Sequence, residues 1–378
     1  MKRWLAAVLV LVMMAVPCRA EEGQPAAVAL AAPSAVLMTL DGQVLFEKDA
    51  HAPREPASVT KVMTMLLVCE AVDQGRVSLK DPVTASAYAA SMGGSQIWLE
   101  EGEVLTVEEM LKCVAVVSAN DCAVALGEHL AGSEESFVSM MNRRAQELGM
   151  QNTRFVNACG LTEEGHFTSA YDIGLMSGQL LREHPWISDY VTIWQDSVRA
   201  GASVLNNTNK LLKSYPDITG LKTGYTSTAG YCVSATARRE GLHLIAVIMG
   251  GESSASRNGD AAALLSWGFA NYAAVTLTAD QPLLPLPVTM GKTDRTPLEL
   301  GEQQPMVLEK RLLGGLEKTL ELPESLSAPV EQGQTVGTLV VRREGKELCR
   351  IPVLAARGTE RLGLWDLFRA VLQHICGR

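Results

Sequence analysis

Residues 62–72 of this chain form a strongly apolar run, and a serine and a lysine stand just before it. Ser58 and Lys61 are three positions apart, and Pro56 upstream suits the first turn of a helix. Positions i and i+3 share one face of a helix, so we expect the lysine amine beside the serine hydroxyl. Because the run is apolar on nearly all sides, it predicts a buried helix. Burial disfavours the charged form of Lys61 and moves its pKa toward the range of a general base.

Two further polar tripeptides lie at element boundaries downstream of this pair. Ser118–Asn120 separates two predicted helices, residues 107–117 and 121–131, and a capping box opens the first helix. Lys222–Gly224 ends a strand that is predicted to begin near residue 215. Taken singly, each motif also fits an ordinary structural role: an exposed first turn for Ser-x-x-Lys, a helix end with an N-cap, and a strand end with a glycine turn.

The sequence up to residue 274 predicts both β-hairpins and amphipathic or buried helices. Two pairs of β-rich runs, each joined by a short polar turn, read as hairpins: residues 35–40 with 43–48, and residues 230–238 with 242–249. Further helices are predicted over residues 134–148, 169–183 and 258–273, whereas residues 76–104 look mixed and loop-like. This pattern predicts an α+β domain over residues 34–274, with an antiparallel sheet flanked by helices.

The N-terminus and the charge balance indicate a compartment and exclude one class of partner. Residues 1–20 read as a secretory signal peptide, and residues 21–33 as a disordered leader rich in alanine and proline. The formal net charge is −9, and cleavage would remove three basic residues and no acidic ones. Binding to a nucleic-acid backbone needs basic patches, so we expect no nucleic-acid partner.

The cysteines and histidines indicate no metal or cofactor site. The eight cysteines include no Cys-x-x-Cys pair, and most lie in apolar stretches of the sequence. This favours buried free thiols over a disulfide framework. The six histidines show no His-x-x-x-His spacing, so no zinc site is expected. The sequence also lacks the Gly-x-Ser-x-Gly elbow of a Ser-His-Asp hydrolase.

The composition changes at about residue 275. Short β-prone segments with proline and glycine predict a small all-β domain over residues 275–357. Residues 358–378 then return to helical periodicity, with Leu364, Trp365 and Phe368 on one apolar face. This segment is too short and too charged to span a bilayer, but it suits an amphipathic anchor in the membrane interface. The alternative is a helix packed on the β domain; we favour the membrane because a terminal apolar face has little left to pack against.

Taken together, the three motifs resemble the signatures of the penicillin-binding-protein and serine β-lactamase superfamily: Ser-x-x-Lys, Ser-x-Asn and Lys-Thr-Gly in this order. The chain is more closely similar to the low-molecular-mass D-alanyl-D-alanine carboxypeptidases, in residues 157–165, 168–172 and 220–231. This resemblance covers about residues 30–272 and implies a β-lactamase/transpeptidase-like catalytic domain. The β domain and the terminal helix are similar to that family's stalk and anchor by layout rather than by motif.

The resemblance implies a serine-type D-Ala-D-Ala carboxypeptidase that needs no cofactor. Ser58 would attack the carbonyl between two D-alanines and form an acyl-enzyme, while Lys61 takes its hydroxyl proton. Ser118 would relay a proton to the leaving amine. Asn120 would contact the substrate amide and brace Lys61.

The strand motif is expected to bind the substrate. Lys222 and Thr223 would meet its terminal carboxylate, and Gly224 would let its backbone approach as an added strand. By resemblance, the backbone N–H groups of Ser58 and Tyr225 would form the oxyanion hole. The family usually has histidine or a similar residue after Lys-Thr-Gly, so Tyr225 at this position is an acceptable variant.

The expected role is trimming of peptidoglycan stem peptides on the outer face of the bacterial membrane, with covalent binding of β-lactams. Two alternatives share the motifs. A class A β-lactamase needs a Ser-Asp-Asn middle motif and a deacylating glutamate; this chain has Ser-Ala-Asn, with Glu163 and Glu164 in the corresponding region. A non-catalytic wall-binding module would keep the fold and bind muropeptides without turnover.

Overall fold

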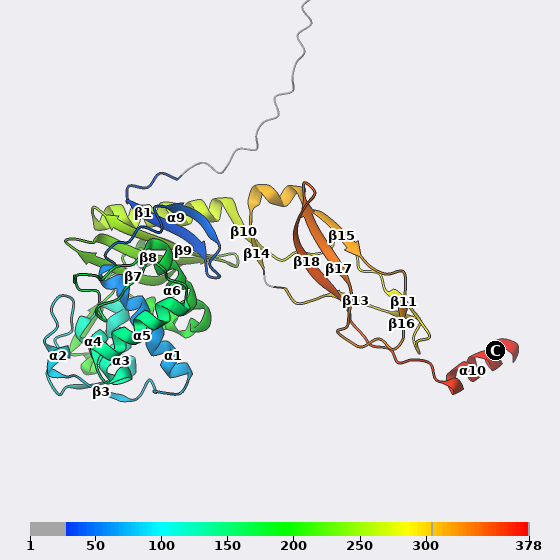
Figure 1. Cartoon of the computed structure of the whole chain (residues 1–378), viewed down its shortest axis with the longest axis horizontal. Helices are drawn as coiled ribbons and strands as arrows, with labels where there is room; N and C mark the ends of the chain where they lie inside the picture. Colours follow the sequence, from blue (N-terminus) through cyan, green and yellow to red (C-terminus); the bar gives the residue numbers. More distant parts are fainter. Residues whose placement is uncertain (1–27, 304, 377–378) are drawn as a thin grey trace, which may run out of the picture.

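The computed structural model describes residues 28–303 and 305–376. The predicted signal peptide and residues 21–27 of the predicted leader lie outside these ranges. The described chain forms a sheet with helices on both faces, then a smaller β-rich part and a final helix (Figure 1). The α+β class predicted from the sequence is confirmed.

Five antiparallel strands form the main sheet, in the order β2-β1-β9-β8-β7. Gly42, at φ 89°, turns the chain between the first two strands, as the Asp-Gly signal predicted. β7 lies at the edge of this sheet, so one side of its backbone pairs with no other strand of the described chain. The strands are β1 (Ser34–Thr39), β2 (Val44–Lys48), β7 (Ile218–Thr226), β8 (Gly230–Arg239) and β9 (Leu242–Gly251).

Helical layers cover both faces of the sheet. α9 (Ser254–Asn271) packs on one face against β1, β8 and β9. α6 covers the other face, and α1 lies beyond it at the centre of a larger apolar core. The helices on that side are α1 (Lys61–Asp73), α3 (Val107–Val116), α4 (Asn120–Ala131), α5 (Glu134–Glu147) and α6 (Ala170–Glu183).

Local signals in the sequence account for where these helices begin and end. Thr106 and Glu109 form the capping box that opens α3, and Gly132 at φ 83° ends α4. The helices predicted near residues 107, 121, 134 and 169 are confirmed. α9 begins at Ser254, four residues before the predicted start at 258, because the Ser253 side chain caps it by accepting from the Ser256 N–H.

Two regions hold more short elements than the sequence predicted. Residues 76–104 contain a pair of strands and one helical turn: β3 (Pro82–Thr84), α2 (Ala87–Ala90) and β4 (Val104–Thr106). Between α6 and β7 lie η2 (Pro185–Ile187), α7 (Ser188–Val191), β5 (Gln195–Val198), η3 (Arg199–Gly201), β6 (Ser203–Asn206) and α8 (Leu211–Ser214). Elements of two to four residues are too short to show a period, so only their pairing partners define them.

The C-terminal part has its own core, formed chiefly by β17, β18 and the strands beside them. Its main sheet has the order β13-β18-β17-β15, and β10 pairs with β14 between the two parts (Figure 1). Its elements are β10 (Tyr272–Val275), β11 (Leu286–Thr289), β12 (Arg295–Thr296), β13 (Leu298–Leu300), β14 (Met306–Glu309), η4 (Lys310–Gly315), β15 (Glu317–Glu321), β16 (Leu326–Ser327), β17 (Thr335–Arg343) and β18 (Lys346–Ala355).

α10 (Leu364–Cys376) lies at the end of the molecule farthest from the main sheet (Figure 1). Leu364 is 88% exposed and Trp365 79% exposed, so these apolar side chains do not pack on the β-rich part. Among the described helices, none combines the length and apolarity needed to cross a membrane. Six cysteines of the described chain are free thiols, and five of these are buried, as the sequence predicted.

Candidate active site

Ser58 and Lys61 lie side by side where the chain enters α1. A 3-10 turn, η1 (Ala57–Thr60), carries the serine and continues directly into the helix. The Lys61 Nζ atom donates to Ser58 Oγ at 3.0 Å. The spacing of three residues therefore places the amine beside the hydroxyl, as the sequence predicted.

Lys61 is fully buried and has two further hydrogen-bond acceptors. Its Nζ atom donates at 2.6 Å to Asn120 Oδ1 and at 2.6 Å to the Cys159 carbonyl. Burial lowers the pKa of Lys61 to about 8. The charged amine donates one N–H to each of Ser58, Asn120 and Cys159. After the loss of one proton, two N–H groups remain for Asn120 and Cys159, and the lone pair can accept from the Ser58 hydroxyl. This arrangement suits a general base.

Ser118 and Asn120 occupy the junction between α3 and α4. Besides accepting from Lys61, Asn120 donates through Nδ2 to the Gly93 carbonyl at 2.6 Å. Ser118 adopts a left-handed backbone conformation at φ 66°, and its buried Oγ has no hydrogen-bond partner within the described chain. Strained backbone and unpaired buried hydroxyls concentrate at functional sites. The hydroxyl is therefore available to a ligand in the adjoining cavity.

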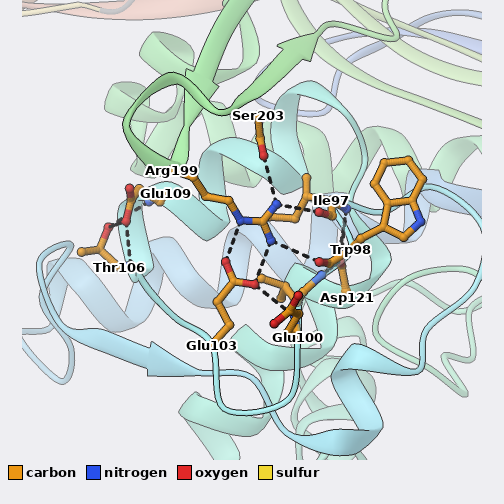
Figure 2. Close-up of polar contacts among 10 residues, drawn as sticks. Ile97, Trp98, Glu100, Glu103, Thr106, Glu109, Asp121, Arg199 and Ser203 are labelled. Carbon is orange, nitrogen blue, oxygen red and sulfur yellow. Dashed lines mark hydrogen bonds and ion pairs between the residues drawn. The ribbon is translucent and has the colours of Figure 1, made fainter.

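Asp121, in the first turn of α4, and Arg199 hold the loop of residues 97–103 in place (Figure 2). The buried Asp121 carboxylate accepts the backbone N–H groups of Ile97 and Leu99, both at 3.1 Å. Arg199 donates to both carboxylate oxygens of Glu103, at 2.6 and 2.8 Å, and to the Ile97 carbonyl at 2.8 Å. These bonds fix the loop against the first turn of α4, next to the Ser-x-Asn motif.

The edge strand β7 brings the third motif to the same place. Gly224 packs so closely on the serine turn that a Cβ atom there would lie 2.9 Å from the Ser58 nitrogen. Glycine is thus required by this close approach. Tyr225, the next residue, is 55% exposed, and its ring stacks on Tyr231 with centroids 4.3 Å apart.

A cavity of about 250 Å³ lies between the helical layer and β7. Its lining contains hydroxyl groups, one guanidinium and two tyrosine rings: Ser58, Ser95, Ser118, Thr208, Thr223, Gly224, Tyr225, Tyr231, Ser254 and Arg257. Five of the eight predicted site residues line it: Ser58, Ser118, Thr223, Gly224 and Tyr225. Lys61 and Asn120 lie directly behind Ser58, to which the Lys61 amine connects them.

Lys222, like Lys61, is buried beneath the surface of the cavity and does not line it. It is 1% exposed, and its Nζ donates to the Thr223 carbonyl at 3.0 Å. Burial, and then the nearby charges of Lys61 and Arg257, hold the pKa of Lys222 well below its usual value. The cation that reaches the cavity surface from this side is Arg257, a residue that the sequence analysis did not identify.

Arg257 comes from the first turn of α9 and is 4% exposed. It donates to the Cys232 carbonyl at 3.3 Å, to Ser254 Oγ at 3.2 Å and to Asn258 Oδ1 at 3.0 Å. These neutral acceptors leave its positive charge uncompensated. The predicted start of this helix at residue 258 excluded Arg257, and no motif marks it, since only the fold brings the first turn of α9 beside β8 and the cavity.

The loop 157–166 was found in the sequence only through its family resemblance. Asn157 Oδ1 organises it by accepting the backbone N–H of Gly160 at 2.7 Å and of Leu161 at 3.2 Å. Glu163 and Glu164 are exposed, and Glu163 contacts the Asn157 side chain rather than Ser58 or Lys61. Glu163 therefore does not take the place of a β-lactamase deacylating base in this structure.

The helix-flanked antiparallel sheet and the Ser-Lys pair at the cavity define a class of protein, the penicillin-binding proteins. Penicillin-binding protein 6B of Escherichia coli is one solved structure that this chain resembles, with a TM-score of 0.72, 30% identity, and coverage of 88% of this chain and 97% of that one. Penicillin-binding protein D2 of Listeria monocytogenes, solved with ampicillin bound, matches with a TM-score of 0.57 and 32% identity over 65% of this chain and all of its own.

The chain belongs to the D-alanyl-D-alanine carboxypeptidase family and is a hydrolase of that family. The model of this family matches residues 20–253, and that of the penicillin-binding protein 5 C-terminal domain matches residues 275–361. The D-alanyl-D-alanine carboxypeptidase DacF of Bacillus subtilis is 41% identical over 88% of this chain and 87% of its own length. The family resemblance inferred from the three motifs is confirmed, and these comparisons favour it over the β-lactamase alternative.

Proposed function

We propose that this protein removes the terminal D-alanine from peptidoglycan stem peptides that end in D-Ala-D-Ala, through an acyl-enzyme on Ser58. The observation that carries the proposal is the 3.0 Å contact between Ser58 Oγ and the buried amine of Lys61, at a cavity that Arg257 also lines. Membership of the carboxypeptidase family supports the reaction class.

Acylation uses the helical side of the cavity. Ser58 Oγ bonds to the carbonyl carbon between the two D-alanines as Lys61 Nζ takes the hydroxyl proton. The peptide C–N bond then breaks as the Ser118 hydroxyl gives its proton to the leaving amine and takes the proton that Lys61 holds, so that Lys61 is neutral again. In the second half-reaction, Lys61 takes a proton from the water that attacks the ester carbon. It returns this proton to Ser58 Oγ as the ester C–O bond breaks. D-alanine and the shortened peptide are the products.

The opposite side of the cavity binds the terminal carboxylate. Within the described chain the Arg257 guanidinium donates to neutral acceptors, and a carboxylate would supply the missing negative charge. Thr223 offers a hydroxyl beside it, which now donates to Thr208 Oγ1 at 2.8 Å. Lys222 lies beneath, and the arrival of a carboxylate would favour its charged form.

The backbone of the serine turn and of β7 stabilises the oxyanion. Gly224 brings β7 against Ser58, so that the N–H groups of Ser58 and Tyr225 can point at one oxygen. The unpaired edge of β7 receives the substrate as an added strand. Because a β-lactam presents a similar carbonyl and carboxylate, we also propose that it acylates Ser58, which the ampicillin-bound Listeria relative supports.

Mass spectrometry after exposure to benzylpenicillin tests the proposal. We expect one covalent adduct, on the peptide that contains Ser58, and its loss in Ser58→Ala. The wild type is expected to release D-alanine from a pentapeptide ending in D-Ala-D-Ala, and Ser58→Ala is not. Release of D-alanine by Ser58→Ala would contradict the proposal. Rapid hydrolysis of benzylpenicillin without a lasting adduct would favour a β-lactamase.

We further propose that the mature protein acts outside the cytoplasmic membrane and that α10 lies in the membrane surface. The exposed side chains of Leu364, Trp365 and Phe368 support this location, since burial in a lipid interface would remove them from water. Flotation with phosphatidylglycerol-containing vesicles provides the test. Wild type is expected to float, and a Trp365→Glu/Phe368→Glu variant to stay in the dense fraction with its D-alanine release unchanged. Equal flotation of both proteins would contradict the role of α10.

A further inference from the structure

We infer that His166 is a positioning residue for the oxyanion hole, acting through Thr60 on the peptide bond between Ala57 and Ser58. This inference rests on the proposed function, because it concerns the N–H that would receive the oxyanion. His166 is 3% exposed, lies outside the three motifs, and has no role in the proton transfers described above.

The hydrogen bonds around His166 have one consistent direction. The Val156 backbone N–H lies 3.1 Å from His166 Nδ1, and a backbone N–H can only donate, so Nδ1 carries no proton. The proton of the neutral ring is therefore on Nε2, which lies 2.9 Å from Thr60 Oγ1. Burial, and then the charge of Lys61, lowers the pKa of His166 to about 4, which keeps the ring neutral at ordinary pH.

Thr60 connects His166 to the serine turn by two hydrogen bonds. Its Oγ1 accepts from His166 and donates to the Ala57 carbonyl at 2.9 Å. Gly160 closes the other side of that carbonyl, since a Cβ atom there would lie only 1.9 Å from the Ala57 oxygen. The Ala57 oxygen is thus held between a hydroxyl donor and a tightly packed loop.

Planarity of the peptide bond carries the effect to the cavity. The Ala57 carbonyl and the Ser58 N–H belong to one trans peptide unit, in which C=O and N–H point in opposite directions. Holding the carbonyl oxygen with Thr60 therefore aims the Ser58 N–H the other way, toward β7, where the Ser58 nitrogen lies beside Gly224. Ala57 needs this support because its φ of 49° is unfavourable for a residue with a side chain.

Paired substitutions at each end of the chain of hydrogen bonds test the inference. Thr60→Val removes the hydroxyl with little change of shape, and Thr60→Ser keeps it. His166→Phe removes both ring nitrogens, and His166→Gln retains a donor near the position of Nε2. Thr64→Val is the matched control, because Thr64 Oγ1 bonds the same loop at the Ala158 carbonyl, 2.6 Å away, but not the Ala57 peptide.

We expect Thr60→Val and His166→Phe to lower kcat for D-alanine release and the acylation rate with benzylpenicillin by about 10- to 100-fold, less than loss of a whole oxyanion donor. KM is expected to stay within about twofold, because the N–H acts mainly on the transition state. Thr60→Ser, His166→Gln and Thr64→Val are expected to remain within about threefold of wild type, and the double variant to be no slower than the slower single one.

Labelling with a fluorescent penicillin counts the folded sites, so partial unfolding of Thr60→Val does not distort these rates. A kcat within about twofold of wild type in both Thr60→Val and His166→Phe would overturn the inference, as would losses confined to KM or independent losses in the double variant. An inactive wild type would instead contradict the proposed function.

Discussion

The two walls of the cavity differ in how their charged side chains are paired. The helical wall carries Ser58 and Lys61, and the strand wall carries Lys222 with Arg257 beside it. On the helical wall, the Lys61 amine has three hydrogen-bond acceptors from three separate segments: Ser58, Asn120 and the loop at Cys159. On the strand wall, the Lys222 amine donates to the Thr223 carbonyl, and the Arg257 guanidinium donates to neutral oxygen atoms. Within the described residues, the helical wall thus joins its amine to three acceptors, whereas the Arg257 charge has no carboxylate as hydrogen-bond partner.

This difference indicates a division of labour. A wall whose groups are already hydrogen-bonded fixes geometry, as proton transfer at one oxygen requires. A wall with uncompensated positive charge gains most of its stabilisation when an anion arrives, as recognition of a carboxylate requires. Substitutions on the helical wall are therefore expected to lower kcat, and those on the strand wall to lower affinity for substrates with a free carboxylate.

The largest effect is expected from Lys61→Met on the helical wall. Loss of a positioned general base lowers the acylation rate by about 10²- to 10⁴-fold. Lys61→Arg is the matched control, since it restores a cation that cannot act as a base at neutral pH. Stopped-flow labelling with benzylpenicillin measures both variants. Near-normal acylation by Lys61→Arg would show that this wall supplies charge rather than a base.

Arg257→Met tests the strand wall. Removal of a charge-assisted hydrogen bond worth about 1.5–3 kcal/mol lowers kcat/KM for a D-Ala-D-Ala peptide by about 10- to 100-fold. The same peptide with a C-terminal amide lacks the anion. We expect the wild type to cleave it more slowly than the acid, and Arg257→Met to change that rate little. Steady-state kinetics on the two peptides make the comparison. An equal loss of kcat/KM on both peptides would show that Arg257 supports the folded structure of the site rather than binding the carboxylate.

The pH dependence of acylation sharpens the contrast further. In the proposed mechanism the active form of Lys61 is neutral, and burial lowers the pKa of Lys61 to about 8. Acylation by benzylpenicillin is therefore expected to fall about tenfold for each pH unit below that value and to level off above it. Arg257→Met keeps this profile, because its charge lies on the other wall. A flat profile between pH 6 and about 8 would contradict the base role of Lys61.

The smallest effect is expected on stability, from Lys222→Met. Its lowered pKa means that the unfolded chain binds a proton more readily than the folded one, so folding is opposed until the pH approaches the usual lysine value. Removing this buried amine is expected to raise Tm by a few degrees at pH 7, and less at pH 10. Thermal unfolding followed by circular dichroism measures both. A lower Tm at pH 7 would show that the Thr223 contact outweighs the cost of burial.

Much of the first domain could be predicted from local patterns. The Asp41-Gly42 turn, the capping box at Thr106 and the glycine after α4 act within a few residues of themselves, and each element appeared where they indicated. The short strands β5 and β6 were missed because four residues carry no periodic signal, and each is defined by its pairing with the other.

The residues of the candidate site also fall into those that local sequence patterns predict and those that they do not. Ser58 and Lys61 were predictable as neighbours, because a single helical turn joins them and helical geometry is local. Arg257, Cys159 and His166 were not. Arg257 reaches the cavity only when α9 packs against β8, and Cys159 and His166 reach it only when the loop 157–166 packs against the serine turn and α1. The contacts of Cys159 and His166 with Lys61 and Thr60 span more than 90 positions of sequence and leave no local pattern.

The amino-acid sequence by itself therefore determined which residues can react and which short segments carry them, since hydroxyl, amine and turn chemistry belong to individual residues. The tertiary structure decided which cation faces the ligand and which lies behind the wall. It also decided which carbonyl receives the Lys61 amine and which ring steadies the serine turn. Those outcomes depend on burial and on distances across the fold, and both arise only when separate layers close around one cavity.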